Sequence, residues 1–325
     1  MWSCCMARLL VAAGLTDEDI VQVAFGYGLF TGAFGLHYGI EEVGATVIPT
    51  SSGNTERQIS VMQDFGTTAL VGTPSYAIHM AEVAEEMGVN LQTLNLRLGL
   101  FGAEASTEEM RDQLEERWGG ILVTENYGMS ELVGPGVAGE CYLKRGMHIN
   151  EDCFLCEIID PDTGEVLKNG EVGELVVTTI NKEGIPLLRY RTRDITYIIE
   201  EPCDCGRTSY RLAKMQGRSD DMMIIKGVNV FPSQIESAIT GIAGISPHYQ
   251  ILLKKKGFAD DIEVLVELAD QGFGDDFKKL LELEKTIKSS LRNTIGLEIN
   301  IKLMNPKTIE RSLGKAKRVV DLRNQ

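Results

Sequence analysis

The segment from Asn126 to Glu131 places a glycine, a hydroxyl and a carboxylate directly after the extended run 121–124. Gly128 allows a ligand to approach the backbone closely, Ser130 offers a hydroxyl, and Glu131 could hold a divalent cation. The same residues also suit an ordinary strand-to-helix turn, with Ser130 and Glu131 as helix caps. The segment taken alone leaves both interpretations open.

Residues 187–194 alternate three arginines with other residues and end in Asp194, in a short extended stretch. An aspartate can accept hydrogen bonds from ribose hydroxyls, while an arginine binds phosphate through two parallel hydrogen bonds. The alternative is a surface strand with exposed ion pairs, which contribute little stability.

Two further polar segments lie toward the C-terminus. Residues 217–221 precede the run 224–232 where the composition changes, so they could form a hinge as well as a contact. Residues 311–318 form a basic, glycine-containing cluster in an acidic protein, which suggests an anionic ligand. A solvated tail is the other interpretation of that cluster.

One set of cysteines and a histidine has the composition of a zinc site. A Cys-x₆-His pair and a Cys-x-Cys pair would together supply three thiolates and an imidazole. The four residues are Cys141, His148, Cys203 and Cys205, with Cys153 and Cys156 as further candidates. Four protein ligands leave no open position, so such a zinc would be structural. Independent, partly buried thiols are the alternative.

The elements that would position these residues alternate between strands and helices, which predicts an α/β fold with a parallel sheet. Ligands bind at the carboxyl ends of such strands, so the segments after Phe101 and Thr124 are candidate sites. Residues 150–215 are β-rich, and the chain from 221 onward predicts a small βαββαβ unit. The N-terminal part predicts extended runs at 20–25, 45–49, 69–71, 97–101 and 121–124, and helices at 55–63, 74–87 and 108–117.

Length and charge restrict the class of protein. The 325 residues suggest about two domains. The formal net charge of −15 argues against a nucleic-acid or anionic-membrane surface. Arg8 interrupts the first apolar stretch, so a helix ending at Gly14 is favoured over a signal peptide. No run approaches the ~18 apolar residues of a membrane span, and we expect a cytoplasmic protein with no membrane or nucleic-acid partner.

The order of these motifs resembles the adenylate-forming acyl-CoA synthetase superfamily. The resemblance rests on Phe101–Glu104, Tyr127–Glu131, Tyr190–Asp194, Gly217–Asp221 and Gly314-Lys315. Within that superfamily the chain is similar to the phenylacetate–CoA ligases. This closer resemblance rests on Tyr27–Gly32, Gly53–Gln58 and Lys226–Glu236.

The resemblance implies a fold and a reaction. Residues 1–219 would form a large adenylation domain with a β-rich subdomain, and residues 220–325 a mobile α+β domain. ATP would react with an aryl acetate to give an acyl-adenylate, and coenzyme A would then displace AMP to form a thioester. Mg²⁺ would be required, and a homodimer is left open.

The resemblance also implies roles for individual residues. Asp194 would hold the ribose, Ser130 and Arg218 would reach phosphate, and Glu131 would bind Mg²⁺. Lys315 would bridge the carboxylate and the α-phosphate. The remaining nucleotide-side candidates are Gly102, Ala103, Glu104, Asn126, Tyr127 and Gly128.

The C-terminal domain would rotate between the two half-reactions. Asp220 would act as the hinge and bring the loop at Lys226 and Gly227 to the thioester step. Phe25, Tyr27 and Phe30 are candidates for an aromatic wall around a phenyl ring, with plain core packing as the alternative. The resemblance adds that cysteines and a histidine like those of the candidate zinc site recur in related ligases.

One superfamily motif is missing from this sequence. The Ser/Thr/Gly-rich phosphate loop that ends in Gly-Lys is absent, and residues 50–55 resemble it without its lysine. The resemblance therefore implies that the chain begins downstream of that loop, and the first half-reaction is expected to be severely impaired. A nucleotide-binding remnant, an interaction protein with degenerate sites and an enzyme that adenylates for another acyl acceptor are the alternatives.

Overall fold

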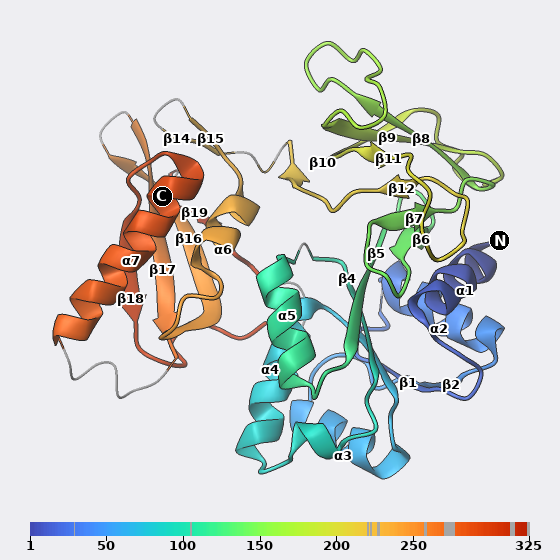
Figure 1. The fold of residues 1–325 in the computed structure, drawn as a ribbon, viewed down its shortest axis with the longest axis horizontal. Helices are drawn as coiled ribbons and strands as arrows, with labels where there is room; N and C mark the ends of the chain where they lie inside the picture. The colour runs from blue at the N-terminus through green and yellow to red at the C-terminus, as the bar shows by residue number, and fades with distance from the viewer. Residues whose placement is uncertain are drawn as a thin grey trace. The chain divides into compact units, whose positions relative to one another are not determined.

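In the computed structural model, the described residues fold into two compact units (Figure 1). The structure describes residues 1–28, 30–104, 106–219, 221, 223–225, 228–256, 259–269, 277–312 and 316–323. Unit 1 contains the described residues of 1–105 and 112–219. Unit 2 contains residues 106–111 and the described residues of 220–312 and 316–325.

The larger sheet of unit 1 has nine strands in the order β11-β12-β7-β6-β5-β4-β3-β1-β2. Strands β2, β1, β3, β4 and β5 are parallel, whereas β5, β6, β7, β12 and β11 pair antiparallel. The strands are β1 (Ile20–Val23), β2 (Thr46–Ile48), β3 (Ala69–Gly72), β4 (Leu98–Gly102), β5 (Leu122–Met129), β6 (Gly134–Glu140), β7 (Met147–Ile149), β11 (Ile198–Ile199) and β12 (Arg211–Leu212). The predicted parallel sheet is thus correct for its first five strands only.

A second, antiparallel sheet of unit 1 has the order β13-β10-β9-β8. Its strands are β8 (Phe154–Ile159), β9 (Gly173–Thr179), β10 (Tyr190–Thr196) and β13 (Gly217–Arg218). It corresponds to the predicted β-rich block. Its last pairing sets Asp194 opposite Arg218.

The first part of the chain also forms α1 (Trp2–Ala13), α2 (Thr31–Val43), α3 (Thr55–Phe65), α4 (Pro74–Glu86), the short 3₁₀ helix η1 (Leu91–Thr93) and α5 (Glu108–Arg117). Helix α1 ends at Gly14, whose φ of 103° lets its N–H reach the carbonyls of Leu10 and Val11. Helix α4 begins at Thr73, whose side chain accepts a hydrogen bond from the N–H of Tyr76.

Helix α2 lies between the predicted extended runs 20–25 and 45–49, where the sequence patterns predict no helix. The glycines serve packing: a Cβ at Gly39 would lie 2.4 Å from the Cβ of Met6, and one at Gly35 would lie 2.6 Å from the ring of Trp2. Helices α1 and α2 therefore pack with their backbones close together. The close packing compensates for the low helix propensity of glycine.

Unit 2 contains the sheet β18-β17-β16-β19, the hairpin β14-β15 and two further helices. These elements are β14 (Met223–Ile225), β15 (Val228–Val230), α6 (Pro232–Ile239), β16 (Ile245–Lys256), β17 (Ala259–Leu268), α7 (Phe277–Ile295), β18 (Asn300–Met304) and β19 (Val319–Asp321). The predicted βαββαβ order is present, with β15 and β19 as additions. Ile235 of α6 and Ile287 of α7 pack with Val264 of β17 in a core of their own.

Among the described residues, no helix combines the length and the apolar character that crossing a membrane requires.

Candidate functional site

A buried tyrosine and a buried aspartate meet where the two sheets of unit 1 come together. The hydroxyl of Tyr127, on β5, donates a hydrogen bond of 2.6 Å to Oδ2 of Asp194 on β10. The guanidinium of Arg218, on β13, lies 3.7 Å from Oδ1 of the same aspartate. We call Tyr127, Asp194 and Arg218 the β5–β10 polar site.

Burial raises the pKa of Tyr127 well above its usual value, and the neighbouring charge of Asp194 raises it further. The tyrosine is therefore a neutral donor that holds one oxygen of the carboxylate in place. The other carboxylate oxygen faces Arg218 at a distance longer than a direct hydrogen bond. The arrangement is able to accept from hydroxyl groups and to place a cation beside an anionic ligand.

The segment after β4 lies against the middle of β5. Gly102 pairs with Asn126 in parallel register, and a Cβ at Gly102 would lie 3.1 Å from the Asn126 carbonyl oxygen. Ala103 is exposed with a φ of 66°, in the left-handed region. The next side chain, Glu104, accepts hydrogen bonds from the Ser75 N–H (3.2 Å) and hydroxyl (2.7 Å), so it is held by the first turn of α4.

The turn after β5 is not the strand-to-helix turn that one interpretation of this segment predicts. Strand β5 continues through Met129, and the chain returns as β6 instead of entering a helix. A Cβ at Gly128 would lie 2.1 Å from the Gly134 carbonyl oxygen, so this hairpin requires glycine. The helix-capping interpretation of Ser130 and Glu131 is wrong, because β5 and β6 form a β-hairpin.

Ser130 and Glu131 are exposed at the tip of this hairpin. The Ser130 hydroxyl lies 2.8 Å from the hydroxyl of Thr31 at the start of α2. The Glu131 backbone carbonyl, not its carboxylate, accepts a hydrogen bond of 2.6 Å from Lys182, and the residue is exposed. An exposed carboxylate suits Mg²⁺, which retains several of its waters.

The three candidate aromatic residues have different environments. Phe25 is 7% exposed and belongs to the core of unit 1. Its ring centroid is 5.4 Å from that of the half-buried Phe30. Tyr27 is also half-buried, and its hydroxyl lies 3.0 Å from Nδ1 of His37. Burial raises the pKa of Tyr27, so its hydroxyl stays protonated.

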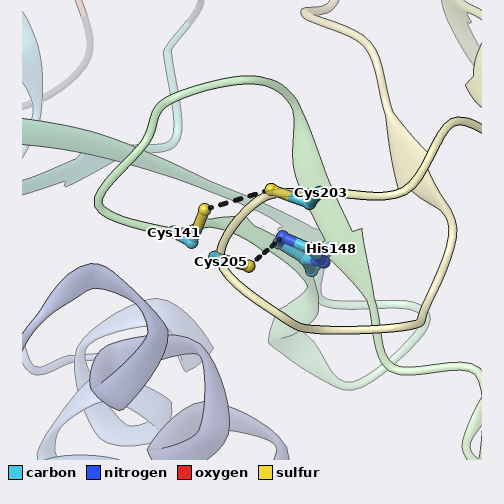
Figure 2. Close-up of side chains that lie close together, drawn as sticks. All are labelled: Cys141, His148, Cys203 and Cys205. Carbon is cyan, nitrogen blue, oxygen red and sulfur yellow. Dashed lines mark hydrogen bonds between the residues drawn. The ribbon is translucent and has the colours of Figure 1, made fainter.

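The four residues of the candidate zinc site come together in the structure (Figure 2). Cys141 follows β6, His148 lies on β7, and Cys203 and Cys205 lie between β11 and β12. Their ligand atoms all lie within 4.8 Å of one another. We call these four residues the cysteine–histidine cluster.

The geometry of the cysteine–histidine cluster fits a tetrahedral metal. The Cys141 and Cys203 sulfurs are 3.8 Å apart, and the Cys205 sulfur is 3.4 Å from Nε2 of His148. Zn–S bonds of about 2.3 Å at tetrahedral angles would separate two sulfurs by about 3.8 Å. Nδ1 of His148 lies 3.3 Å from the Ser209 hydroxyl, which would orient the ring.

The pKa values in the cysteine–histidine cluster differ between its members. Burial and then the charges of Arg207 and Arg211 lower the pKa of His148 to about 4, so the imidazole is neutral as a metal ligand requires. Burial raises the pKa of Cys141 to about 11. Burial alone would raise the pKa of Cys205, but hydrogen bonds, chiefly from Arg207, outweigh it and lower the pKa to about 7.

The two spare cysteines lie elsewhere. Cys153 Sγ lies 3.5 Å from Cys5 Sγ, and Cys156 lies on β8; neither is grouped with the four clustered ligands. Four other predicted site residues lie outside the described residues: Asp220, Lys226, Gly227 and Lys315.

Sequence reasoning missed the partners Thr31, His37 and Ser209. Thr31 and His37 lie on α2, which the sequence patterns do not predict. Recognising this helix from the sequence would have pointed to both residues. Ser209 follows Cys205 by four residues in the same loop, where a hydroxyl near two candidate thiolates was a usable signal.

The chain is similar to known proteins in both sequence and fold. The model of the AMP-binding enzyme family matches residues 4–181, and that of the AMP-binding enzyme C-terminal domain matches residues 227–323. The phenylacetate-coenzyme A ligase of Pseudomonas putida is 46% identical over 99% of this chain and 73% of its own length. Those of Thermus thermophilus and Escherichia coli are each 43% identical, and this chain covers 74% of each.

Solved structures agree with this similarity. A 2-hydroxyisobutyryl-CoA ligase, crystallised in its postadenylation state with an adenylate, matches with a TM-score of 0.93 and 27% identity. The match covers 98% of this chain and 69% of that one. The fold is therefore the adenylate-forming fold, with a large AMP-binding domain and a small C-terminal domain.

Proposed function

Because the chain belongs to the AMP-binding enzyme family and is a homologue of phenylacetate-coenzyme A ligases, we propose that it ligates an aryl acetate to coenzyme A through an acyl-adenylate. As a member of that family it is an AMP-forming, phenylacetate-CoA ligase-like enzyme. The observation that carries the proposal is the 43–46% identity to four such ligases over 98–99% of the chain. The proposal includes that this chain has the activity by itself, without another polypeptide.

In the proposed reaction, the carboxylate of the aryl acetate attacks the α-phosphate of ATP and releases pyrophosphate. The thiol of coenzyme A then attacks the acyl carbon and releases AMP. The β5–β10 polar site supports the nucleotide part of this proposal, because Asp194 would accept from the ribose hydroxyls while Tyr127 fixes its orientation. Arg218 would balance phosphate charge beside it.

The residues around the polar site would complete nucleotide binding. The backbone at Gly102, Ala103 and Asn126 would line the adenine side, since Gly102 and Asn126 lie side by side. Glu104 would line the same side and would be held in place by the hydrogen bonds that it accepts from Ser75. Ser130 would reach a phosphate, and Glu131 would hold Mg²⁺, which offsets phosphate charge when bound.

We further propose an aromatic wall in which Tyr27 and Phe30 face the aryl group and Phe25 supports them from the core. This division follows their burial, since Phe25 is 7% exposed whereas Tyr27 and Phe30 are only half-buried. Aromatic rings in such a wall favour edge-to-face or offset contacts with a phenyl ring.

We propose zinc in the cysteine–histidine cluster as a structural ion. All four ligand atoms face one another, so no position is left for a substrate. Zinc would connect the loop between β11 and β12 to β7 and the end of β6.

We propose a domain boundary between residues 219 and 220, with Asp220 as the hinge of the C-terminal domain and Lys226 and Gly227 at the thioester step. The cytoplasm is the proposed compartment, given that a phenylacetate-coenzyme A ligase would use cytoplasmic ATP and coenzyme A.

Lys315→Ala tests the proposed reaction. Loss of the ammonium should reduce carboxylate-dependent ATP–pyrophosphate exchange by about 100-fold or more while sparing the attack of coenzyme A on supplied phenylacetyl-adenylate. Lys317→Ala, two residues away in the same segment, is the matched control. An exchange rate that is unchanged in Lys315→Ala would overturn the assignment.

A second candidate is a protein of the same family that binds a nucleotide but forms the acyl-adenylate inefficiently. This sequence does not contain the Ser/Thr/Gly-rich loop that ends in Gly-Lys, and it spans 73–74% of the length of the phenylacetate-coenzyme A ligases that it matches. Strong AMP binding without thioester product from supplied adenylate would favour a nucleotide-binding protein, and product on another thiol or amine acceptor would favour a different acyl acceptor.

A further inference from the structure

Unit 2 contains a carboxylate, Glu267, that is almost completely buried and has several hydrogen-bond donors. Glu267 lies near the end of β17 and is 1% exposed. Its Oε1 accepts from Nη2 of Arg311 (2.7 Å) and from the Ser246 hydroxyl (3.2 Å). Its Oε2 accepts from Nη1 of Arg311 (2.9 Å) and from the N–H of Ile309 (3.0 Å).

These hydrogen bonds keep Glu267 ionised inside the unit. Burial alone would raise the pKa of Glu267, but hydrogen bonds from Arg311 and from backbone N–H groups outweigh it and lower the pKa. The pair is bidentate, the geometry that fixes an arginine most firmly. Arg311 also donates to the Ile309 carbonyl at 2.8 Å, so the local chain is folded around the carboxylate.

Most of the groups that donate hydrogen bonds to Glu267 belong to the segment just before Lys315 in the chain. Ile309 and Arg311 lie six and four residues before that lysine, whereas Ser246 lies in β16. Four residues span at most about 14 Å when fully extended. The position at which Arg311 is held therefore sets an upper limit on how far the backbone of residue 315 can lie from Glu267.

The chain is also anchored three residues after Lys315, at Arg318. The Arg318 carbonyl accepts from the N–H of Ile251 at 2.7 Å, and its guanidinium lies 4.3 Å from the ring centroid of Tyr249. Strand β19 then pairs with β16 in parallel. Both anchors thus rest on the same four-stranded sheet, at Glu267 on β17 and at Tyr249 and Ile251 on β16.

From this geometry we infer that Glu267 is a positioning residue for Lys315: it fixes Arg311, and through it the short segment that carries the lysine. The inference rests on the role proposed above for Lys315 in adenylate formation. Glu267 touches no substrate in this account. Its contribution is to restrict the approach of the lysine to the reacting phosphate, where a misplacement of about 1 Å can cost about 100-fold in rate.

Glu267→Gln tests the inference, with Glu263→Gln as the matched control. Glu263 also lies on β17 and forms an ion pair, with Lys254 on β16, but it has no bond to the segment that carries Lys315 among those that the structure describes. We expect Glu267→Gln to lower carboxylate-dependent ATP–pyrophosphate exchange by about 10- to 100-fold. Thioester formation from supplied phenylacetyl-adenylate and coenzyme A should stay within about twofold of the unmodified chain.

A merely structural role would lower both half-reactions together, so the split between them is informative. Limited trypsin digestion gives a readout that does not depend on catalysis, because trypsin cleaves after lysine. Cleavage after Lys315, followed by mass spectrometry, should become at least about tenfold faster in Glu267→Gln and stay unchanged in Glu263→Gln.

Breaking a buried ion pair can prevent folding, because one charge is left without its partner. The double variant Glu267→Met with Arg311→Met removes both charges at similar volume and keeps the test valid if the single variant fails to fold. It should show the same split between half-reactions and the same faster cleavage. Far-ultraviolet circular dichroism establishes that each variant is folded.

The two proposals fail in different ways. If Lys315→Ala leaves the exchange rate unchanged, the role of the lysine fails whatever Glu267→Gln does. If Lys315→Ala abolishes exchange but the folded Glu267 variants keep both the exchange rate and slow cleavage after Lys315, the positioning role is overturned. If the unmodified chain shows no exchange, unchanged cleavage in the folded variants still overturns it.

Discussion

The β5–β10 polar site and the cysteine–histidine cluster both contain buried side chains, yet they differ in the kinds of group that they bring together. In the cluster all four ligand atoms lie within 4.8 Å of one another, so an ion at their centre would have four protein ligands. In the polar site Tyr127 occupies one oxygen of Asp194, while Arg218 stays 3.7 Å from the other. Four protein ligands around one point indicate a structural metal, whereas a carboxylate held beside a hydroxyl and a guanidinium is suited to the hydroxyl and phosphate groups of a ligand.

The largest expected effect is on AMP affinity, and it tests whether the β5–β10 polar site binds the nucleotide or only packs in the core. Asp194→Ala removes the acceptor for the ribose hydroxyls, and we expect AMP affinity to fall by at least about 100-fold, or about 3 kcal/mol. Isothermal titration calorimetry with AMP measures it. Asp162→Asn, at an exposed position of the same unit, should bind AMP normally. Equal affinity in Asp194→Ala would show that this site does not hold the nucleotide.

The second effect tests whether the cysteine–histidine cluster is structural. Cys203→Ser should abolish stoichiometric zinc and cost about 2–3 kcal/mol of stability, which lowers Tm by about 5–10 °C. Metal analysis and differential scanning calorimetry measure the two quantities. Cys4→Ser, at an exposed cysteine, is the control and should change neither. Purified unmodified chain without zinc would refute the proposed ion.

A smaller effect is expected from removing the hydroxyl that orients Asp194. Tyr127→Phe deletes the 2.6 Å hydrogen bond but leaves the carboxylate in place. AMP affinity should therefore fall by about 5- to 10-fold, less than in Asp194→Ala. A loss as large as that of Asp194→Ala would mean that Tyr127 itself contacts the nucleotide.

The smallest effect concerns pH. The pKa of Tyr127 is raised well above 10, so its hydroxyl keeps its proton, and its hydrogen bond, until the pH rises through that higher value. AMP affinity should change by less than about twofold between pH 8 and pH 10. A drop in affinity near pH 10 that disappears in Tyr127→Phe would contradict the raised pKa.

The sequence predicted elements best where local signals agree. The bounds of α5 match the prediction at both ends, with Glu108 and Glu109 in the first turn and Arg117 in the last, as the helix dipole favours. The four residues of the cysteine–histidine cluster were also identified, because thiolates and an imidazole form a recognisable set even when far apart in the chain.

Local signals failed where distant packing decides the structure. Glycines, which disfavour a helix, serve in α2 to admit Trp2 and Met6 from α1, residues more than 30 positions away. The bond between Tyr127 and Asp194 joins residues 67 positions apart on two different sheets. Contacts of this kind follow from how the sheets pack, which no local pattern contains.

The most direct test of the central claim is acyl transfer to coenzyme A by this chain. The purified chain is mixed with phenylacetyl-adenylate and coenzyme A, and phenylacetyl-CoA and AMP are quantified by liquid chromatography with mass spectrometry. We predict equimolar phenylacetyl-CoA and AMP at a rate that depends on the concentration of the chain. Adenylate hydrolysed only to phenylacetate, or consumed no faster than in buffer, would contradict the account.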